Sequence, residues 1–80
     1  MPPPLPPDHA LGLAIKELRE ARGLTQEELA SRADTTIGTI SRVEAAKSAP
    51  AWATVMQIID AMDVSLPELA QAVETARRRP

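Results

Sequence analysis

A chain of 80 residues with a formal net charge of −2 is long enough for one small domain, and its core must be built almost without aromatic side chains, because Trp52 is the only one. The absence of cysteine excludes a disulfide framework and a thiolate metal site. No apolar run approaches the ~20 residues of a membrane span, and no signal-peptide pattern is found, so we expect a cytoplasmic protein without membrane contact.

The chain begins with a proline-rich segment, residues 1–7, in which five residues are proline. We interpret it as a solvated, disordered arm, because proline disfavours helix and favours an extended polyproline backbone. The alternative is a recognition arm or a ligand for a proline-binding groove. The arm has no Lys or Arg with which to hold DNA phosphates, which favours the simple tail.

A first helix is expected from Asp8, as its N-cap, to about Arg22, and Gly23 is a suitable residue to end it. Its core-facing apolar residues recur at spacings of four and three: Leu11, Ile15 and Leu18. His9 is the only histidine and has no second ligand near it in sequence. We therefore interpret it as a solvated side chain and not as a metal ligand, and we expect no metal site and no cofactor.

Residues 25–44 predict two short helices joined by a tight turn. Thr25 and Glu28 have the spacing of a capping box at the start of the first of these helices. Thr36 can cap the second helix. The apolar residues that should face inward are Leu29, Ala30, Ala33, Ile40 and Val43.

The second half of the chain predicts two further helices, at about residues 51–62 and 66–76. Ser65 and Glu68 form a second capping box. Trp52 falls in the apolar stripe of the earlier helix, so we interpret it as a core residue and not as a platform for a ligand. The residues expected to face inward are Trp52, Val55, Ile58, Ile59, Met62, Leu66, Leu69, Ala70 and Val73.

Charge is unevenly distributed along the chain. Residues 16–47 carry six basic and six acidic side chains, residues 48–76 carry four acidic and no basic ones, and a basic tail, residues 77–80, adds three arginines. The net negative charge argues mildly against a nucleic-acid partner, since such domains are often basic. The positive charge in the half with the two short helices is nevertheless compatible with DNA binding.

Three segments and one proline closely resemble the lambda-repressor-like helix-turn-helix proteins of the Cro-repressor or XRE type. They are GLTQEELA at residues 23–30, TISRVE at 39–44, Pro50, and VSLPEL at 64–69. The resemblance implies an all-α fold, a compact five-helix lambda-repressor-like bundle. Its domain would span residues 8–76, with the helix-turn-helix motif at 25–44, between the arm and the tail.

In such proteins the second motif helix enters the major groove of double-stranded DNA and the first crosses the backbone. Gln26 matches a phosphate-contacting position, although an ordinary polar role is the alternative, and Lys47 keeps one basic charge in the following loop. Arg19 and Glu44 match an Arg and a Glu that form an ion pair in relatives. The implied DNA-facing residues of the second motif helix are Thr36, Ile37, Gly38, Thr39, Ser41 and Arg42.

Several positions depart from the family pattern. Ile37 and Gly38 stand where many relatives carry long polar side chains, and Gly38 costs helix stability of about 1 kcal/mol relative to Ala. The loop at residues 45–48 has lost most of the family's basic charge, so we expect modest affinity with a shallow salt dependence. Asp34 replaces the usual turn glycine and can adopt the positive φ that the turn requires.

The leading hypothesis is a sequence-specific DNA-binding transcriptional regulator, a homodimer on an inverted-repeat operator. Its dimer contacts are expected on the fifth helix and the end of the fourth, with Met56 and Val73 as apolar candidates. The alternative is a protein-interaction module on the same fold, such as an antitoxin-like subunit or an adaptor with a protein partner. An enzyme is not expected, because no nucleophile–base arrangement and no phosphate-binding glycine loop is found.

Overall fold

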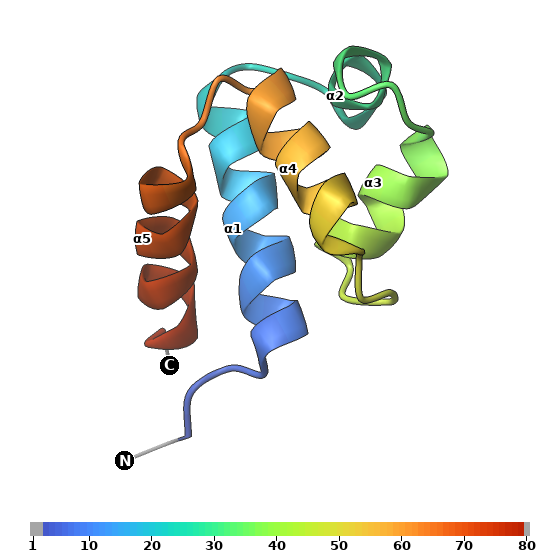
Figure 1. The fold of residues 1–80 in the computed structure, drawn as a ribbon. Helices are drawn as coiled ribbons and strands as arrows, with labels where there is room; N and C mark the ends of the chain where they lie inside the picture. Colours follow the sequence, from blue (N-terminus) through green and yellow to red (C-terminus); the bar gives the residue numbers. More distant parts are fainter. Residues whose placement is uncertain (1–2, 80) are drawn as a thin grey trace.

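The computed structural model describes residues 3–79, so Met1 and Pro2 of the predicted arm and Pro80 of the predicted tail lie outside the described residues. Within that range the chain forms five α-helices and no strand (Figure 1). The helices are α1 (Pro7–Ala21), α2 (Gln26–Arg32), α3 (Ile37–Glu44), α4 (Trp52–Ala61) and α5 (Leu66–Arg77). The predicted all-α, five-helix fold is confirmed.

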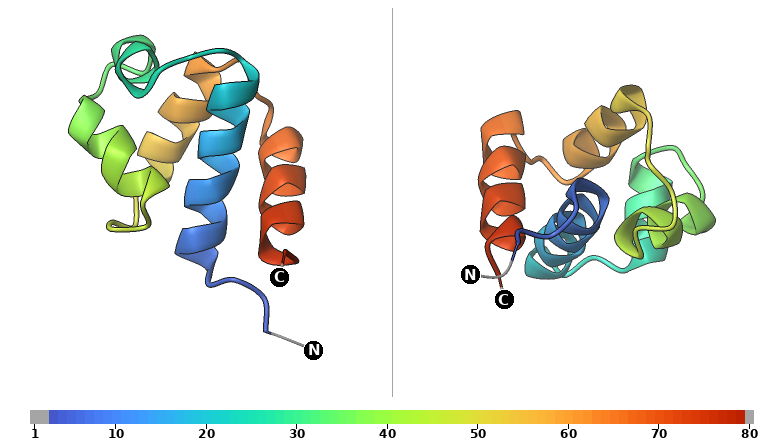
Figure 2. Two further views of the ribbon diagram at one scale, coloured as in Figure 1. Left: turned by 180° about the vertical axis from the view of Figure 1, so that it is seen from behind. Right: turned by 90° about the horizontal axis from the view of Figure 1, so that it is seen from below.

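The longest helix, α1, is the centre of the arrangement. It packs against α5 on one side and α3 on the other, while α2 contacts both α3 and α4 (Figures 1 and 2). The side chains that fill the space between the helices are aliphatic: Ile15, Leu24, Leu29, Ala30, Ala33, Ile40, Val43, Val55, Ile58, Ile59, Met62, Val64 and Leu69. Leu11 and Leu18 lie partly buried against this core, as their spacing predicted.

In residues 3–79 no helix combines the length and the apolar character needed to cross a lipid bilayer.

Polar caps start three of the helices as the sequence predicts. Thr25 and Glu28 form one complete capping box, and Ser65 and Glu68 form another. Hydrogen bonds from the cap residues lower the pKa of both glutamates, and the bond from the backbone N–H of the cap residue has the largest effect. Thr36 caps α3 by accepting a hydrogen bond from the Thr39 N–H. Each cap satisfies N–H groups that have no partner inside the helix, and so sets where the helix begins.

The connections between helices use positive φ angles at four residues. Gly23, after α1, has φ +68°, and Asp34, in the turn between α2 and α3, has φ +55°, as expected for these two positions. Asp63, after α4, and Ala46, after α3, also have positive φ. At Ala46 the left-handed conformation is unfavourable because its Cβ crowds the backbone, and this conformation costs about 1–2 kcal/mol.

Two large apolar residues predicted to be buried are exposed: Trp52 at 63% and Leu66 at 43%. Each is the first residue of its helix. A helical side chain leans over the turn that precedes it, and at the first position no such turn exists to carry it onto the core. Val64, just before α5, is buried in place of Leu66. Ala70, also predicted to face inward, is exposed too, because α5 turns Leu69 and Ala76 to the interior.

The start of α1 also differs from the prediction. The helix begins at Pro7, and Asp8 lies in the first turn instead of capping it. Proline suits this position because its φ is already helical and it has no N–H to satisfy. Within the predicted arm, Leu5 is partly buried and its N–H donates to the Arg77 carbonyl at 3.1 Å. This part of the arm therefore lies against the end of α5.

A glycine in the middle of α1 sets the distance between α1 and α3. A Cβ on Gly12 would lie 2.5 Å from the Val43 carbonyl oxygen and 2.8 Å from that of Glu44. Both contacts are with backbone, which cannot move aside as a side chain can. The absence of a side chain at Gly12 therefore allows the end of α3 to lie directly on α1.

Replacing a glycine with alanine should have opposite effects on stability at Gly12 and at Gly38. Gly12→Ala should lower the free energy of unfolding by ~1–3 kcal/mol, because overpacking against the α3 carbonyls outweighs the better helix propensity of alanine. Gly38→Ala is the matched control, because the close contact of its new Cβ would be with the mobile end of Arg42, 3.0 Å away, and not with backbone. The control should raise stability by up to ~1 kcal/mol.

Urea unfolding followed by circular dichroism measures both variants. Equal effects in the same direction would show that the close approach at Gly12 does not determine how α1 and α3 pack.

Candidate nucleic-acid interface

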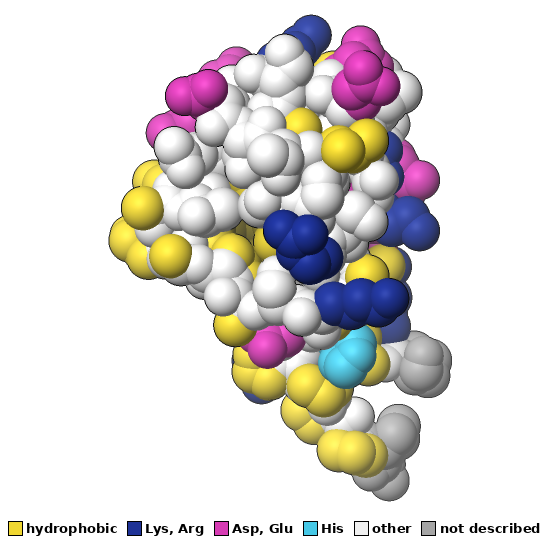
Figure 3. All heavy atoms as spheres, turned by 90° about the vertical axis from the view of Figure 1, so that its right-hand side faces the viewer, with side chains coloured by type: hydrophobic (Ala, Val, Ile, Leu, Met, Phe, Trp, Pro, Cys, Tyr) yellow, Lys and Arg dark blue, Asp and Glu magenta, His cyan; other side chains and the backbone are white. Residues whose placement is uncertain are grey.

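The outward side of α3 is a polar and largely open surface. Ile37, Ser41 and Arg42 are exposed on it, and Gly38 and Thr39 are partly exposed. Its opposite side buries Ile40 and Val43 in the core. Figure 3 views the molecule from the side of α2 and α3, with basic side chains in the middle of this face and several acidic ones toward its upper edge. The predicted base-reading residues therefore form one continuous surface on one short helix.

Arg42 and Gly38 occupy neighbouring positions on this surface. The Arg42 guanidinium lies over Gly38, with Nη1 only 3.0 Å from where a Cβ would be. In a helix, side chains four residues apart share a face, and the later one leans toward the earlier one. The missing side chain at Gly38 therefore leaves room for the Arg42 guanidinium to lie across the helix.

Two threonine hydroxyls lie at the start of α3. Thr36 Oγ1 accepts from the Thr39 N–H at 3.1 Å and lies 3.0 Å from Thr39 Oγ1. Whichever hydroxyl donates within this pair, the proton of the other hydroxyl remains available for a hydrogen bond outside the pair. One hydroxyl donor is thus available next to Ile37, which is 50% exposed.

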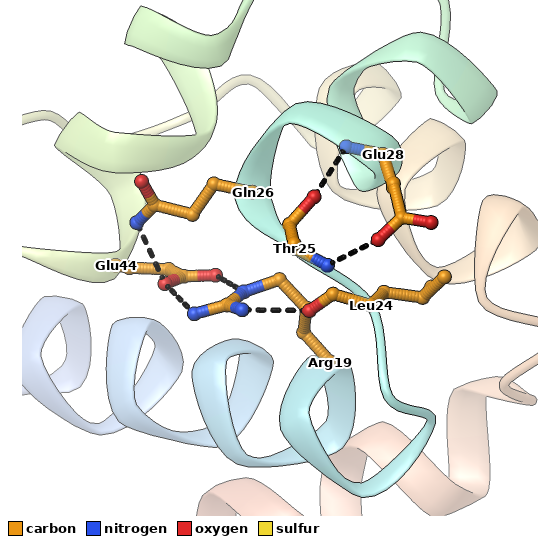
Figure 4. A network of polar contacts seen from close by, with 6 residues as sticks. All are labelled: Arg19, Leu24, Thr25, Gln26, Glu28 and Glu44. Atoms are coloured by element: carbon orange, nitrogen blue, oxygen red, sulfur yellow. Dashed lines mark hydrogen bonds and ion pairs between the residues drawn. The ribbon is translucent and has the colours of Figure 1, made fainter.

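A buried ion pair fixes the end of α3 (Figure 4). Arg19 on α1 donates from Nε to Glu44 Oε2 at 2.7 Å and from Nη2 to Oε1 at 3.0 Å, the pairing that the family resemblance implied. The two side chains are only 10% and 4% exposed. Hydrogen bonding to Glu44 raises the pKa of the Arg19 guanidinium. Two parallel bonds between planar groups hold both orientation and distance.

The same network reaches the start of α2. Arg19 Nη1 donates to the Leu24 carbonyl at 2.8 Å, just before the Thr25 cap. Gln26 donates from Nε2 to Glu44 Oε1 at 3.0 Å. Figure 4 shows Gln26 and Arg19 converging on the Glu44 carboxylate. Both motif helices are therefore tied to α1 through one carboxylate.

A shallow hollow of about 190 Å³ lies beside this network. Its lining comes from α1, α2, α3 and the residue after α3: Lys16, Gln26, Ser41, Glu44 and Ala45. Lys16 was not among the predicted site residues. Lys16, Gln26 and Ser41 lie on three different helices, so no spacing in the sequence relates them. Only the packing of α1 against the motif brings the three together.

The remaining predicted basic groups are placed differently. Lys47 is exposed after α3, and its backbone N–H donates to the Arg42 carbonyl at 2.8 Å. The arginines of the predicted tail lie elsewhere and pair with acidic side chains, Arg77 and Arg78 with Glu74, and Arg79 with Glu17. The tail therefore adds no unpaired positive charge to the α3 surface.

A profile of the helix-turn-helix domain matches residues 10–73, most of the chain. The chain belongs to the helix-turn-helix family. No curated protein matches the sequence significantly.

Solved structures of three other proteins have the same fold. The clp gene regulator ClgR from Corynebacterium glutamicum is 24% identical, with a TM-score of 0.85 over 95% of this chain and 96% of that one. The restriction-modification controller protein C.AhdI from Aeromonas hydrophila is 28% identical, with a TM-score of 0.74 over 76% and 92%. The controller protein C.Esp1396I is 20% identical, with a TM-score of 0.87 over 92% and 95%.

The buried ion pair makes a prediction about stability. Glu44→Gln should lower the free energy of unfolding by ~3–5 kcal/mol, because it leaves the buried Arg19 guanidinium without a counter-charge. Replacing both partners with apolar residues, Arg19→Met with Glu44→Leu, should cost clearly less than the sum of the single changes. Chemical denaturation of Glu44→Gln, of the single variants Arg19→Met and Glu44→Leu, and of the double variant measures this coupling.

Arg78→Ala is the control for a pair at the surface, because Arg78 and Glu74 are largely solvent-accessible. It should cost less than ~1 kcal/mol. A Glu44→Gln effect as small as this would mean that the ion pair does not hold α3 in place.

Proposed function

We propose that this chain is a sequence-specific DNA-binding transcriptional regulator that places α3 in the major groove. The observation that carries the proposal is the combination found on α3. Its outward side presents Arg42 and Ser41, which form no ion pair or hydrogen bond through their side chains within residues 3–79, while its end is fixed by a buried ion pair. Similar structures described as a gene regulator and as controller proteins support a regulatory role, and no enzymatic role is proposed.

Each exposed group on this surface has a distinct role in the proposal. The Arg42 guanidinium donates two hydrogen bonds to O6 and N7 of a guanine. Ile37 contacts a thymine methyl group, the apolar feature of the major groove. Thr36, Thr39 and Ser41 donate to base edges or phosphates, and Gln26 and Lys47 contact phosphates. Gly38 acts through Arg42, since it leaves the space in which that side chain lies.

We further propose that two copies bind an inverted repeat. A single eight-residue α3 spans too few base pairs for a specific site, and a two-fold dimer doubles the sequence that is read. Trp52 supports a dimer contact on α4, because it is the most exposed large apolar side chain of the described residues, and Met56 follows one turn later. Met56 and Val73, the residues predicted for this contact, are partly buried against the core.

The exposed Ile37 favours a second candidate, a protein-interaction module with weak or no specific DNA binding. An exposed apolar side chain at the start of a polar helix face suits a protein partner as well as a thymine methyl group. Selection of bound sites from a random pool of duplex DNA separates the two candidates. A symmetric, enriched motif supports the regulator, and an unenriched pool rejects it in favour of the interaction module.

The first functional prediction compares Arg42 with Lys47. On the selected site Arg42→Ala should cost ~1–3 kcal/mol of binding free energy and relax the preference at one base pair per half-site. Lys47→Ala should weaken selected and scrambled duplexes about equally and lower the salt slope by about one unit per protomer. Titrations of both duplexes at several salt concentrations measure the two effects. Equal losses on both duplexes for Arg42→Ala would rule out base reading by Arg42.

The second functional prediction concerns the dimer. Trp52→Ala should shift the protein toward monomer, because an interface loses most when a large central aromatic side chain is truncated. Ile37→Ala is the control, another exposed apolar residue at the first position of its helix, but on the proposed DNA-facing side of α3, and it should leave the association of the free protein unchanged. Sedimentation velocity over a range of concentrations, with and without the selected duplex, measures both. A wild-type protein that stays monomeric under all these conditions rejects the dimer.

A further inference from the structure

The hollow between α1, α2 and α3 has a composition suited to an anion. Its lining includes Lys16, Gln26 and Ser41, each with at least one donor, and Glu44, whose side chain is only 4% exposed. Glu44 alone would repel an anion, but the two bonds from Arg19 compensate its charge. Arg19 and Lys16 supply two positive charges, and Glu44 and Glu20, which both act on Arg19, supply two negative ones. The charges are therefore balanced, and within residues 3–79 Lys16 is the one of these cations that has no ion-pair partner.

The donors in this hollow differ in how firmly they are held. Gln26 is already oriented, because one proton of its amide nitrogen is bound to Glu44 at 3.0 Å while the second remains available. Ser41 is exposed on α3, one turn after Ile37. Lys16 is exposed on α1 and forms no ion pair within residues 3–79. A fixed amide therefore lies beside a hydroxyl and an ammonium group that are both free to adapt.

The position of the hollow indicates which anion it can hold. It adjoins the exposed face of α3 and the first turn of α2, where the DNA backbone passes when α3 occupies the major groove. The hollow, about 190 Å³ in volume, is open to solvent and is not an enclosed cavity. A hollow open on this side can receive the oxygens of one phosphodiester group of a strand that passes over it.

We propose that Lys16, Gln26 and Ser41 hold one backbone phosphate at the edge of the major groove, with Lys16 of α1 as the charged partner. The inference rests on the proposed DNA-binding function and adds α1 to the interface. Gln26 sets the position of the phosphate, since its own orientation is fixed by the ion pair. Lys16 supplies the electrostatic attraction that a neutral amide and a hydroxyl lack.

The first test compares two lysines that change the net charge equally. Lys16→Met keeps the apolar stem and removes the ammonium group, and Lys47→Met does the same in the loop after α3. On the selected duplex each variant should lower the slope of log affinity against log salt by about one unit per protomer. An unchanged slope for Lys16→Met, beside a reduced slope for Lys47→Met, would overturn the proposal.

The second test asks whether the three residues meet at one phosphate. Duplexes that carry a single neutral methylphosphonate at successive backbone positions are titrated with the wild type, Lys16→Met, Ser41→Ala and Lys47→Met. At one position in each half-site, the methylphosphonate should weaken DNA binding by the wild type. The same methylphosphonate should have little further effect on binding by Lys16→Met and a reduced effect on binding by Ser41→Ala. Binding by Lys47→Met should be weakened by that methylphosphonate as much as binding by the wild type. It should instead be unaffected by a methylphosphonate at a different position, where Lys47 makes its contact. If Lys16→Met and Ser41→Ala lose sensitivity at different phosphates, the shared site is wrong.

The failure of this inference is separable from failure of the proposed function. If the wild type binds no duplex at low salt, the DNA-binding proposal falls and the phosphate site falls with it. If the wild type binds and selects a sequence, but Lys16→Met behaves like the wild type at every phosphate, only the role of Lys16 is rejected. Thermal unfolding of each variant establishes that the changes in affinity do not come from loss of the fold.

Discussion

The buried ion pair between Arg19 and Glu44 is the interaction on which the geometry of the motif depends. Removing two charges from water is unfavourable, and an apolar pair of similar size often stabilises a protein as well or better. What an apolar pair lacks is direction. The guanidinium bonds the carboxylate twice and the Leu24 carbonyl once, while Gln26 bonds the same carboxylate from α2. One buried charge pair thus orients three helices in a way that aliphatic packing alone does not.

The directional ion pair has a steric counterpart at Gly12. Helices α2 and α3 have seven and eight residues, and isolated helices of that length are not stable in water. Their structure therefore depends on the rest of the fold, and the close contact of α1 with the last carbonyls of α3 provides part of it. The ion pair and the glycine contact act at the same end of α3. The other end, with Thr36, Ile37 and Gly38, remains free to meet a ligand.

Much of this structure could be predicted because it depends on short-range chemistry. The capping boxes, the positive φ of Asp34 and the aliphatic stripes follow from residue type and spacing. The exposure of Trp52 and Leu66 could not be found by counting periods, because periodicity does not show that a first-turn side chain lacks a preceding turn to lie on.

The features of the site that the sequence did not predict depend on contacts between distant residues. Gly12 is important only because the carbonyls of Val43 and Glu44 lie against it, and Lys16 only because α1 lies beside Gln26 and Ser41. The space that Gly38 leaves for the Arg42 guanidinium is a local i,i+4 effect. Sequence reasoning had treated these two residues separately, as a poor helix former and a base reader, so the relation between them became visible only in the structure.

The use of charge across the chain indicates where the binding energy for DNA must come from. Arg19 forms an ion pair with Glu44, Arg22 lies near Glu68, and the three arginines at residues 77–79 pair with Glu17 and Glu74. The cationic side chains that form no ion pair within the described part of the chain are Lys16, Arg32, Arg42 and Lys47. So few free charges give only a weak, sequence-independent attraction to DNA, since that attraction grows with the number of phosphates neutralised. Under the proposed function, a protein of this composition reaches a useful affinity only where base contacts add to this attraction. The rigid placement of α3 is then a requirement for binding and not only for specificity.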